Sequence, residues 1–214
     1  MGADDPGTAG ESMAPVALLK AGNERFLSSI AAAPDPAAAA RALARADPYA
    51  VVLGCSDSRV PPELVFDETV GRLFVVRVVA HVAGNDEIGS IEYAVARWNC
   101  RLVVVLGHTE CGGVAAAMDP LPPGAEPPPV TGSMHLSMLV GSVRSNLGWT
   151  SSQPAGDPWA EAVRMSVRRT IERLLLWSTS IRSRVEAGQL AVVGAVYDVS
   201  TGRVEFLEQA TRRP

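Results

Sequence analysis

The chain has 214 residues, a length at which one domain with a full apolar core is the ordinary outcome. Apolar residues make up 47% of it, charged residues 20%, and the formal net charge is −4. This balance is typical of a globular protein and argues against nucleic acid as the main partner, because no Lys/Arg cluster in the sequence overrides the negative charge. No segment reaches the roughly 18 uninterrupted apolar residues that a membrane span needs, so we expect no membrane partner.

The N-terminal residues 1–13 are rich in Gly, Asp and Ser and lack the basic and apolar regions of a secretory signal. We expect this segment to be disordered and to be followed by a single domain over residues 14–214. Three cysteines, Cys55, Cys100 and Cys111, are too few for a disulfide framework. They suit a reducing compartment, so the sequence predicts a cytoplasmic protein.

The predicted elements alternate between helices and strands. Two helical patterns come first, at residues 15–33 and then at 35–47, where Asp35 is expected to cap a helix that begins at Pro36. Four short apolar runs and a last run after a turn are predicted strands: 49–54, 72–80, 101–107, 189–199 and 203–209. Further helical patterns lie between them: 87–99, 111–118 and a long one near 157–187.

The first four runs are apolar throughout instead of alternating, which is typical of strands buried on both faces of a parallel sheet. The last run follows a turn and is predicted to be an antiparallel edge strand. The fold class is therefore α/β, with a mostly parallel sheet of about four strands plus that edge strand, flanked by helices. The Pro/Gly-rich segment 119–133 is interpreted as a loop within this domain.

Two of the predicted strands are followed by residue types that can bind a metal ion. Cys55 and Asp57 follow the first strand, with Arg59 two residues further on, and His108 and Cys111 follow the third. Ligand sites of open α/β sheets collect at the carboxyl ends of strands, so these loops are expected to meet. Two thiols, one imidazole and one carboxylate form a suitable set for tetrahedral zinc.

Each of these residues alone has an ordinary alternative. A cysteine near a strand end is more often a packed small apolar residue, and a lone histidine is more often hydrogen-bonded in the core or at the surface. The specific feature is that both clusters follow predicted buried strands. Cys100 is the contrast, because it precedes a strand without a companion ligand and is interpreted as a plain buried thiol.

The segments that carry these residues resemble the β-class carbonic anhydrases. The resemblance rests on "CSDSRVPPELVFD", "LFVVR", "GSIEYAV" and "VVLGHTECGGV", and on "LLKAGNERF" near the N-terminus. It extends from about residue 16 to about residue 207. It implies reversible hydration of carbon dioxide to bicarbonate and a proton by zinc-bound hydroxide, with Zn²⁺ as the cofactor.

The resemblance also implies roles for the clustered residues. Cys55, His108 and Cys111 bind zinc, and water or Asp57 takes the fourth position. A carboxylate only accepts hydrogen bonds, so Asp57 can orient the hydroxide while Arg59 holds Asp57 off the metal. A closed, inactive form with Asp57 on zinc is expected at lower pH. Because two thiolates cancel the charge of the ion, activity should rise toward alkaline pH.

The positions that match the family's substrate pocket are Phe74, Val79, Tyr93 and Gly112. Part of this pocket is expected to come from a second copy, because the family forms homodimers or dimers of dimers in which the N-terminal helix crosses onto the partner. Glycines after Cys111 let the backbone approach the metal loop closely.

The chain departs from the family pattern at several positions. Ala46 stands where many members have a glutamine, Val78 and His81 replace two asparagines, and Val52 replaces the tryptophan of an allosteric bicarbonate site. We interpret His81 as a surface or interface histidine in preference to a proton shuttle. Two alternatives stay open: a hydrolase of carbonyl sulfide or carbon disulfide, and a weakly active zinc-stabilised dimer.

Overall fold

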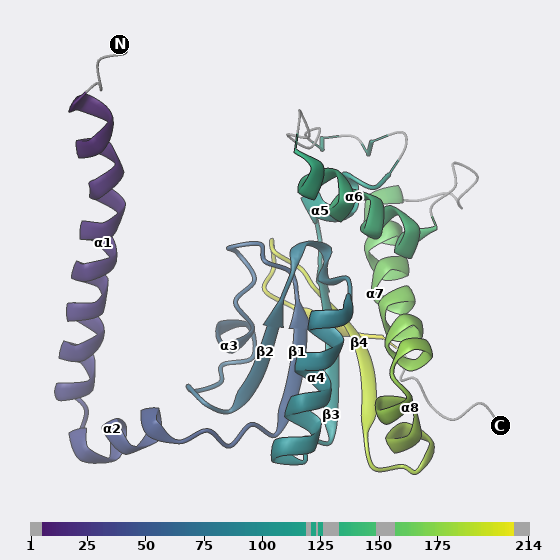
Figure 1. The fold of residues 1–214 in the computed structure, drawn as a ribbon. Coiled ribbons are helices and arrows are strands. Elements are labelled where there is room, and N and C mark those ends of the chain that lie inside the picture. The colour runs from purple at the N-terminus through teal and green to yellow at the C-terminus, as the bar shows by residue number, and fades with distance from the viewer. Residues whose placement is uncertain (1–5, 119–120, 123, 126–132, 149–156, 208–214) are drawn as a thin grey trace. The chain divides into compact units, whose positions relative to one another are not determined.

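The computed structural model describes residues 6–118, 121–122, 124–125, 133–148 and 157–207 (Figure 1). The chain divides into two compact units, Met1–Ala46 and Asp47–Pro214, and each is described by itself.

The first unit consists of helices α1 (Pro6–Ala31) and α2 (Pro36–Ala44). Asp35 caps α2 as the sequence predicted, because its carboxylate accepts a hydrogen bond of 2.8 Å from the Ala38 N–H. The disorder predicted for residues 1–13 differs from the structure: residues 6–13 are helical, and residues 1–5 lie outside the described part. Extending an existing helix fixes one residue for each hydrogen bond gained, so α1 continues into a segment that is poor in apolar residues.

The second unit contains the predicted five-stranded sheet, in the order β2-β1-β3-β4-β5. The first four strands in this order are parallel and β5 is antiparallel to β4, which confirms the predicted fold class. The strands are β1 (Ala50–Gly54), β2 (Leu73–Arg77), β3 (Leu102–His108), β4 (Ala191–Tyr197) and β5 (Val204–Phe206). The strand predicted over 72–80 ends at Arg77, because Ala80 and His81 have φ angles of 57° and 48°, which extended pairing does not allow.

Short and long helices connect these strands: α3 (Pro62–Val65), η1 (Val79–His81), α4 (Asn85–Trp98), α5 (Gly112–Ala115), α6 (Met134–Leu147), α7 (Pro158–Trp177) and α8 (Thr179–Glu186). The long helix predicted near 157–187 is two helices, because Ser178 ends α7 and caps α8 by accepting a 3.0 Å hydrogen bond from the Ile181 N–H. Helix α6 was not predicted. The predicted loop 119–133 lies mostly outside the described residues.

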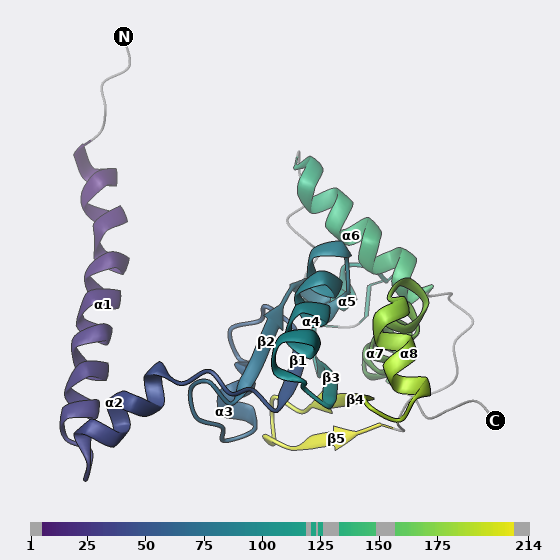
Figure 2. The ribbon, with the colours of Figure 1, turned by 60° about the horizontal axis from the view of Figure 1, so that its bottom comes forward.

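Strands β1, β3 and β4 are covered on both faces, as the apolar runs predicted, whereas the residues of β2 are only partly buried or exposed. Helices α4 and α7 lie on one face (Figures 1 and 2), where Val51 and Leu53 of β1 belong to the main core. On the other face Val52 packs in a smaller cluster with Val60 of the loop that leads to α3. All five residues of β1 are buried. Because β1 and β3 are parallel neighbours, the loops that follow them leave the sheet at the same edge.

Candidate metal centre

Cys55 follows the last residue of β1 and is held by an extension of the β1–β2 ladder. The Val78 N–H donates to the Gly54 carbonyl at 3.1 Å, and the Ser56 N–H donates to the Val78 carbonyl at 3.2 Å. These bonds keep the backbone on both sides of Cys55 in line with the sheet. The Cys55 side chain is buried.

His108 ends β3, and Cys111 precedes α5 as its N-cap residue. The ligand atoms of Cys55, His108 and Cys111 all lie within 4.8 Å of one another, and all three side chains are buried. The two sulfurs are 3.9 Å apart. The expected meeting of the two loops is therefore confirmed.

The ring of His108 presents one nitrogen to this cluster. Its Nδ1 lies 2.9 Å from the Thr109 carbonyl, an arrangement in which Nδ1 carries the proton and donates. Nε2 then has a free lone pair, and it is buried without a hydrogen-bond partner among the described residues. A backbone acceptor on one ring nitrogen and a lone pair on the other is the usual state of a metal-binding histidine.

The contact between the two sulfurs shifts the pKa values of the two cysteines in opposite directions. A hydrogen bond from Cys111 lowers the pKa of Cys55, and the same bond together with burial raises the pKa of Cys111. Two buried sulfurs beside an unpartnered imidazole nitrogen form a donor set that a divalent cation satisfies, and this combination of soft and borderline donors suits zinc. The residues present therefore fit the zinc ion that the sequence predicted.

Asp57 lies beside the cluster, paired with Arg59. One carboxylate oxygen, Oδ1, accepts from the Arg59 N–H at 2.9 Å and from its Nε at 3.0 Å, and the other, Oδ2, accepts from Nη2 at 2.8 Å. These bonds lower the pKa of Asp57 to about 2, so the carboxylate is ionised at neutral pH. Oδ2 is 3.9 Å from Nε2 of His108.

Glu110 adds a weaker contact to the same arginine. Its carboxylate is 3.6 Å from Arg59 Nη1, and its carbonyl accepts from Nη2 at 3.5 Å. Arg59 thus links the loop after β1 to the loop after β3, on the side where the Asp57 carboxylate lies.

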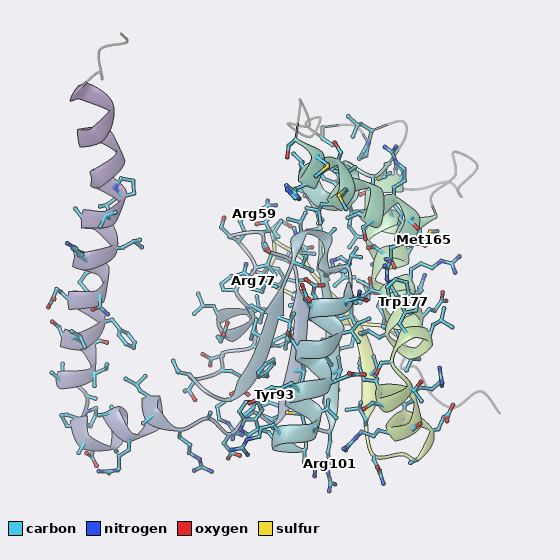
Figure 3. All side chains as sticks on the ribbon, in the orientation of Figure 1. Arg59, Arg77, Tyr93, Arg101, Met165 and Trp177 are labelled. Carbon is cyan, nitrogen blue, oxygen red and sulfur yellow. The ribbon has the colours of Figure 1, made fainter. Side chains whose placement is uncertain are left out.

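The four predicted pocket residues fall into two groups. Gly112 directly follows Cys111 and begins helix α5. Val79 packs against the same helix, as shown by the 2.5 Å that would separate its Cγ1 from a Cβ added to Gly113. Phe74 instead pairs with Val51, three residues before the β1 strand ends, and its ring is 6.5 Å from that of Tyr93. Figure 3 shows Arg59 at one end of the sheet and Tyr93 toward the other.

Sequence reasoning was wrong about His81 and overlooked Arg77 and Trp159. His81 is fully buried, so the expected surface position is wrong, and burial lowers its pKa to about 4. Arg77 and Trp159 donate hydrogen bonds to the loops of the two cysteines. An arginine that ends the strand next to Cys55 was a usable signal, whereas nothing local to Trp159 pointed to Cys111, which is 48 residues away.

None of the described helices has the length and apolar character required to span a membrane.

Comparison with known proteins agrees with the geometry. A sequence model described as carbonic anhydrase matches residues 50–204. Carbonic anhydrase 2 of Mycobacterium tuberculosis is 38% identical over 191 residues, which cover 86% of this chain and 87% of the relative. A carbonic anhydrase of Mycolicibacterium smegmatis is 39% identical over 199 residues, with 90% and 93% covered.

A similar solved structure is a Coccomyxa β-carbonic anhydrase in complex with acetazolamide. It has a TM-score of 0.73 and 25% identity, and the match covers 93% of this chain and 88% of that one. The chain therefore belongs to the β-class carbonic anhydrases, zinc lyases that convert carbon dioxide and water reversibly into bicarbonate and a proton.

Proposed function

We propose that Cys55, His108 and Cys111 hold the zinc ion of this carbonic anhydrase, and that Asp57 and Arg59 complete its catalytic site. The observation that carries this proposal is the meeting of three buried ligand atoms within 4.8 Å, with an ionised carboxylate beside them. A purely structural zinc site would not need that carboxylate and its arginine, which is why the weakly active dimer is the poorer alternative.

The roles that we propose for Asp57 and Arg59 follow from which of them accepts and which donates hydrogen bonds. When zinc is bound, it supplies a Lewis acid that lowers the pKa of a water molecule toward neutrality. Asp57 can only accept, so it accepts a hydrogen bond from the attacking oxygen and leaves a lone pair of that oxygen directed at carbon dioxide. Arg59 occupies both carboxylate oxygens, which keeps Asp57 from moving onto the metal.

Carbon dioxide is the substrate that we propose for this site. The matched relatives are carbonic anhydrases, so a hydrolase of carbonyl sulfide or carbon disulfide is not favoured. Val79, beside α5, gives this end of the sheet an apolar surface suited to a small apolar molecule.

The test is zinc content together with the rate of carbon dioxide hydration from pH 7 to pH 9. We expect one zinc ion for each chain and a rate that rises with pH, because two thiolate ligands reduce the extent to which the ion lowers the pKa of its bound water.

Asp57→Ala should keep zinc and lose activity by about 100-fold or more, as expected for removal of a group that accepts the hydrogen bond of the attacking oxygen. Glu172→Ala, which removes a surface carboxylate paired with Arg169 at 2.8 Å, is the matched control. A zinc-loaded parent protein without activity at pH 9 would contradict the proposal.

We also propose a homodimer in which Phe74 and Tyr93 line the pocket of the partner, with residues 14–214 acting as one catalytic domain. Support comes from their location: within its own chain, Phe74 lies well before the strand end that carries Cys55. Exposed apolar side chains on α1 supply a surface for the contact: Val16, Leu18, Leu19, Phe26 and Leu27. The dimer of dimers is the alternative assembly.

Mixed dimers test this shared pocket. Dimers of an Asp57→Ala chain with a Tyr93→Ala chain contain one site with both defects and one intact site, provided that Tyr93 serves the partner. Activity of the mixture should therefore exceed that of the two single variants averaged. A mixture that only averages them would show that each Tyr93 serves its own chain or neither.

A cytoplasmic location is proposed from the chemistry of the site. Cys55, Cys100 and Cys111 are all free thiols, and two of them must stay reduced to bind metal. Fractionation of cells that produce the protein should recover it with cytoplasmic markers.

A further inference from the structure

The backbone carbonyls of both ligand cysteines accept a hydrogen bond from a side chain outside their own loops. Arg77 Nε donates to the Cys55 carbonyl at 2.9 Å. Trp159 Nε1 donates to the Cys111 carbonyl at 3.1 Å. These donors come from different elements, β2 and α7, so each ligand loop is tied separately to the body of the fold.

The hydrogen bonds of Arg77 span the three residues from Cys55 to Asp57. While its Nε donates to the Cys55 carbonyl, its Nη2 donates to the Asp57 carbonyl at 2.5 Å. One rigid guanidinium therefore holds both ends of this segment. Within this segment the Asp57 N–H donates a hydrogen bond to the Cys55 sulfur at 3.4 Å. Arg77 therefore fixes the ligand and the catalytic carboxylate relative to each other.

The contact made by Trp159 is fixed by the start of α7. The Asp157 carboxylate caps this helix by accepting from the Trp159 N–H at 2.9 Å and from the Ala160 N–H at 3.2 Å. The indole, half-buried against the core, then reaches the Cys111 carbonyl, which also accepts from the Ala115 N–H at 3.0 Å. Two donors on one carbonyl hold the backbone of Cys111 in a single conformation.

We propose that Arg77 and Trp159 are positioning residues that set the two cysteine sulfurs at their separation before zinc binds. The carbonyl oxygen and the side chain share the same Cα, so fixing the carbonyl limits where the sulfur can lie. The two sulfurs are 3.9 Å apart, and loops free to move would let this separation vary. Ordering the loops in the folded protein removes an entropic penalty from metal binding. This inference rests on the proposed ligand set.

The test measures zinc affinity by competition with a chelator, using Arg77→Met and Trp159→Phe. Met keeps most of the arginine stem, and Phe keeps an aromatic ring, but both lose the donor. We expect zinc affinity to fall about tenfold in each variant, the lower end of the effect of groups that orient metal ligands. Arg77→Lys should recover part of the loss, because an ammonium can donate to the same carbonyls.

Two control variants remove the same residue types elsewhere. Trp177→Phe changes a tryptophan at the other end of α7, and Arg101→Met changes an exposed arginine at the far end of the sheet (Figure 3). Both should bind zinc as the parent does. Urea unfolding of the zinc-free proteins provides the second measurement, since a positioning role predicts weaker zinc binding without a matching loss of stability.

The outcomes separate this inference from the proposed function. Failure of the parent protein to bind zinc would overturn the ligand set itself. Normal zinc binding by the parent, with Arg77→Met and Trp159→Phe within twofold of it, would overturn the positioning role alone. A fall in affinity that matches the fall in zinc-free stability would also overturn it, because the two side chains would then act only on the fold.

Discussion

Cysteines lie at both ends of the central sheet, and their surroundings differ. At the amino end, before β3, the buried Cys100 thiol donates to the Pro48 carbonyl at 3.1 Å, and burial raises its pKa. At the carboxyl end, Cys55 and Cys111 face each other and an unpartnered histidine nitrogen. All three are buried to a similar degree. Burial therefore does not distinguish a ligand from a packed thiol, whereas the groups that the sulfur faces do.

The largest expected effect comes from exchanging sulfur for oxygen at each end. Cys55→Ser or Cys111→Ser should abolish stoichiometric zinc binding and with it the activity, because a serine hydroxyl stays protonated and is a poor zinc ligand. Cys100→Ser should keep both, since a hydroxyl can still donate to Pro48. Zinc content by mass spectrometry and carbon dioxide hydration measure the outcome. Loss of zinc in Cys100→Ser would erase the distinction between the two ends.

The carboxyl end was the more predictable of the two. Cys55, Asp57 and Arg59 are adjacent in sequence, and parallel strands bring His108 and Cys111 to the same edge, so topology alone joins the cluster. The strands were predictable because a continuous apolar run has few other stable environments.

The remaining features depend on contacts that no local pattern encodes. Trp159 reaches Cys111 across 48 residues, and the end of β2 at Arg77 depends on left-handed backbone at His81. The break between α7 and α8 depends on one serine, Ser178, in a helical pattern that is otherwise continuous. In each case tertiary packing selected one of several conformations that the sequence permits.

His81 is a second buried polar group at the carboxyl end, and its ring nitrogens have no hydrogen-bond partner among the described residues. Burial lowers its pKa to about 4, below the ordinary value of about 6.5 that it regains on unfolding. Between these values the unfolded chain binds a proton that the folded chain does not, so stability falls as pH drops from about 6.5 to about 4 and then levels off. The contribution is about 3 kcal/mol.

Urea unfolding at pH 7 and pH 4.5, with chelator present throughout, measures this contribution. The parent protein should lose more stability on acidification than His81→Gln, which has no titrating group. Equal losses in both proteins would mean that another group controls the acid sensitivity, and that His81 does not add to the difference between the two ends.

Two adjacent glycines at the metal-binding end, Gly112 and Gly113, differ in the space around them. A Cβ on Gly113 would lie 2.5 Å from the Val79 Cγ1 and 3.1 Å from the Ala80 backbone nitrogen, whereas a Cβ on Gly112 would meet nothing within 4 Å. Gly113→Ala should therefore destabilise the fold by about 2 kcal/mol through overpacking, and Gly112→Ala should change stability little. Thermal unfolding of the two variants measures the difference. Equal stability would show that η1 moves away from α5 without penalty.

The smallest expected effect lies at the amino end, where aromatic packing takes the place of metal ligands. The Trp98 ring is 5.5 Å from that of Phe74 and 5.6 Å from that of Tyr93, with Arg97 over its face. Trp98→Leu should lower the free energy of unfolding by about 1 kcal/mol, because these ring contacts are lost while an apolar side chain remains.

Zinc affinity decides what this last variant means. We expect Trp98→Leu to bind zinc as tightly as the parent protein, because the contacts that hold Cys55 and Cys111 come from the opposite end of the sheet. Chelator competition on the parent, on Trp98→Leu and on Trp177→Leu provides the measurement. Weaker zinc binding in Trp98→Leu alone would mean that packing at the amino end is transmitted along β1 and β3 to the sulfurs. The ligand geometry would then be a property of the whole sheet, and Arg77 and Trp159 would share the positioning role with its core.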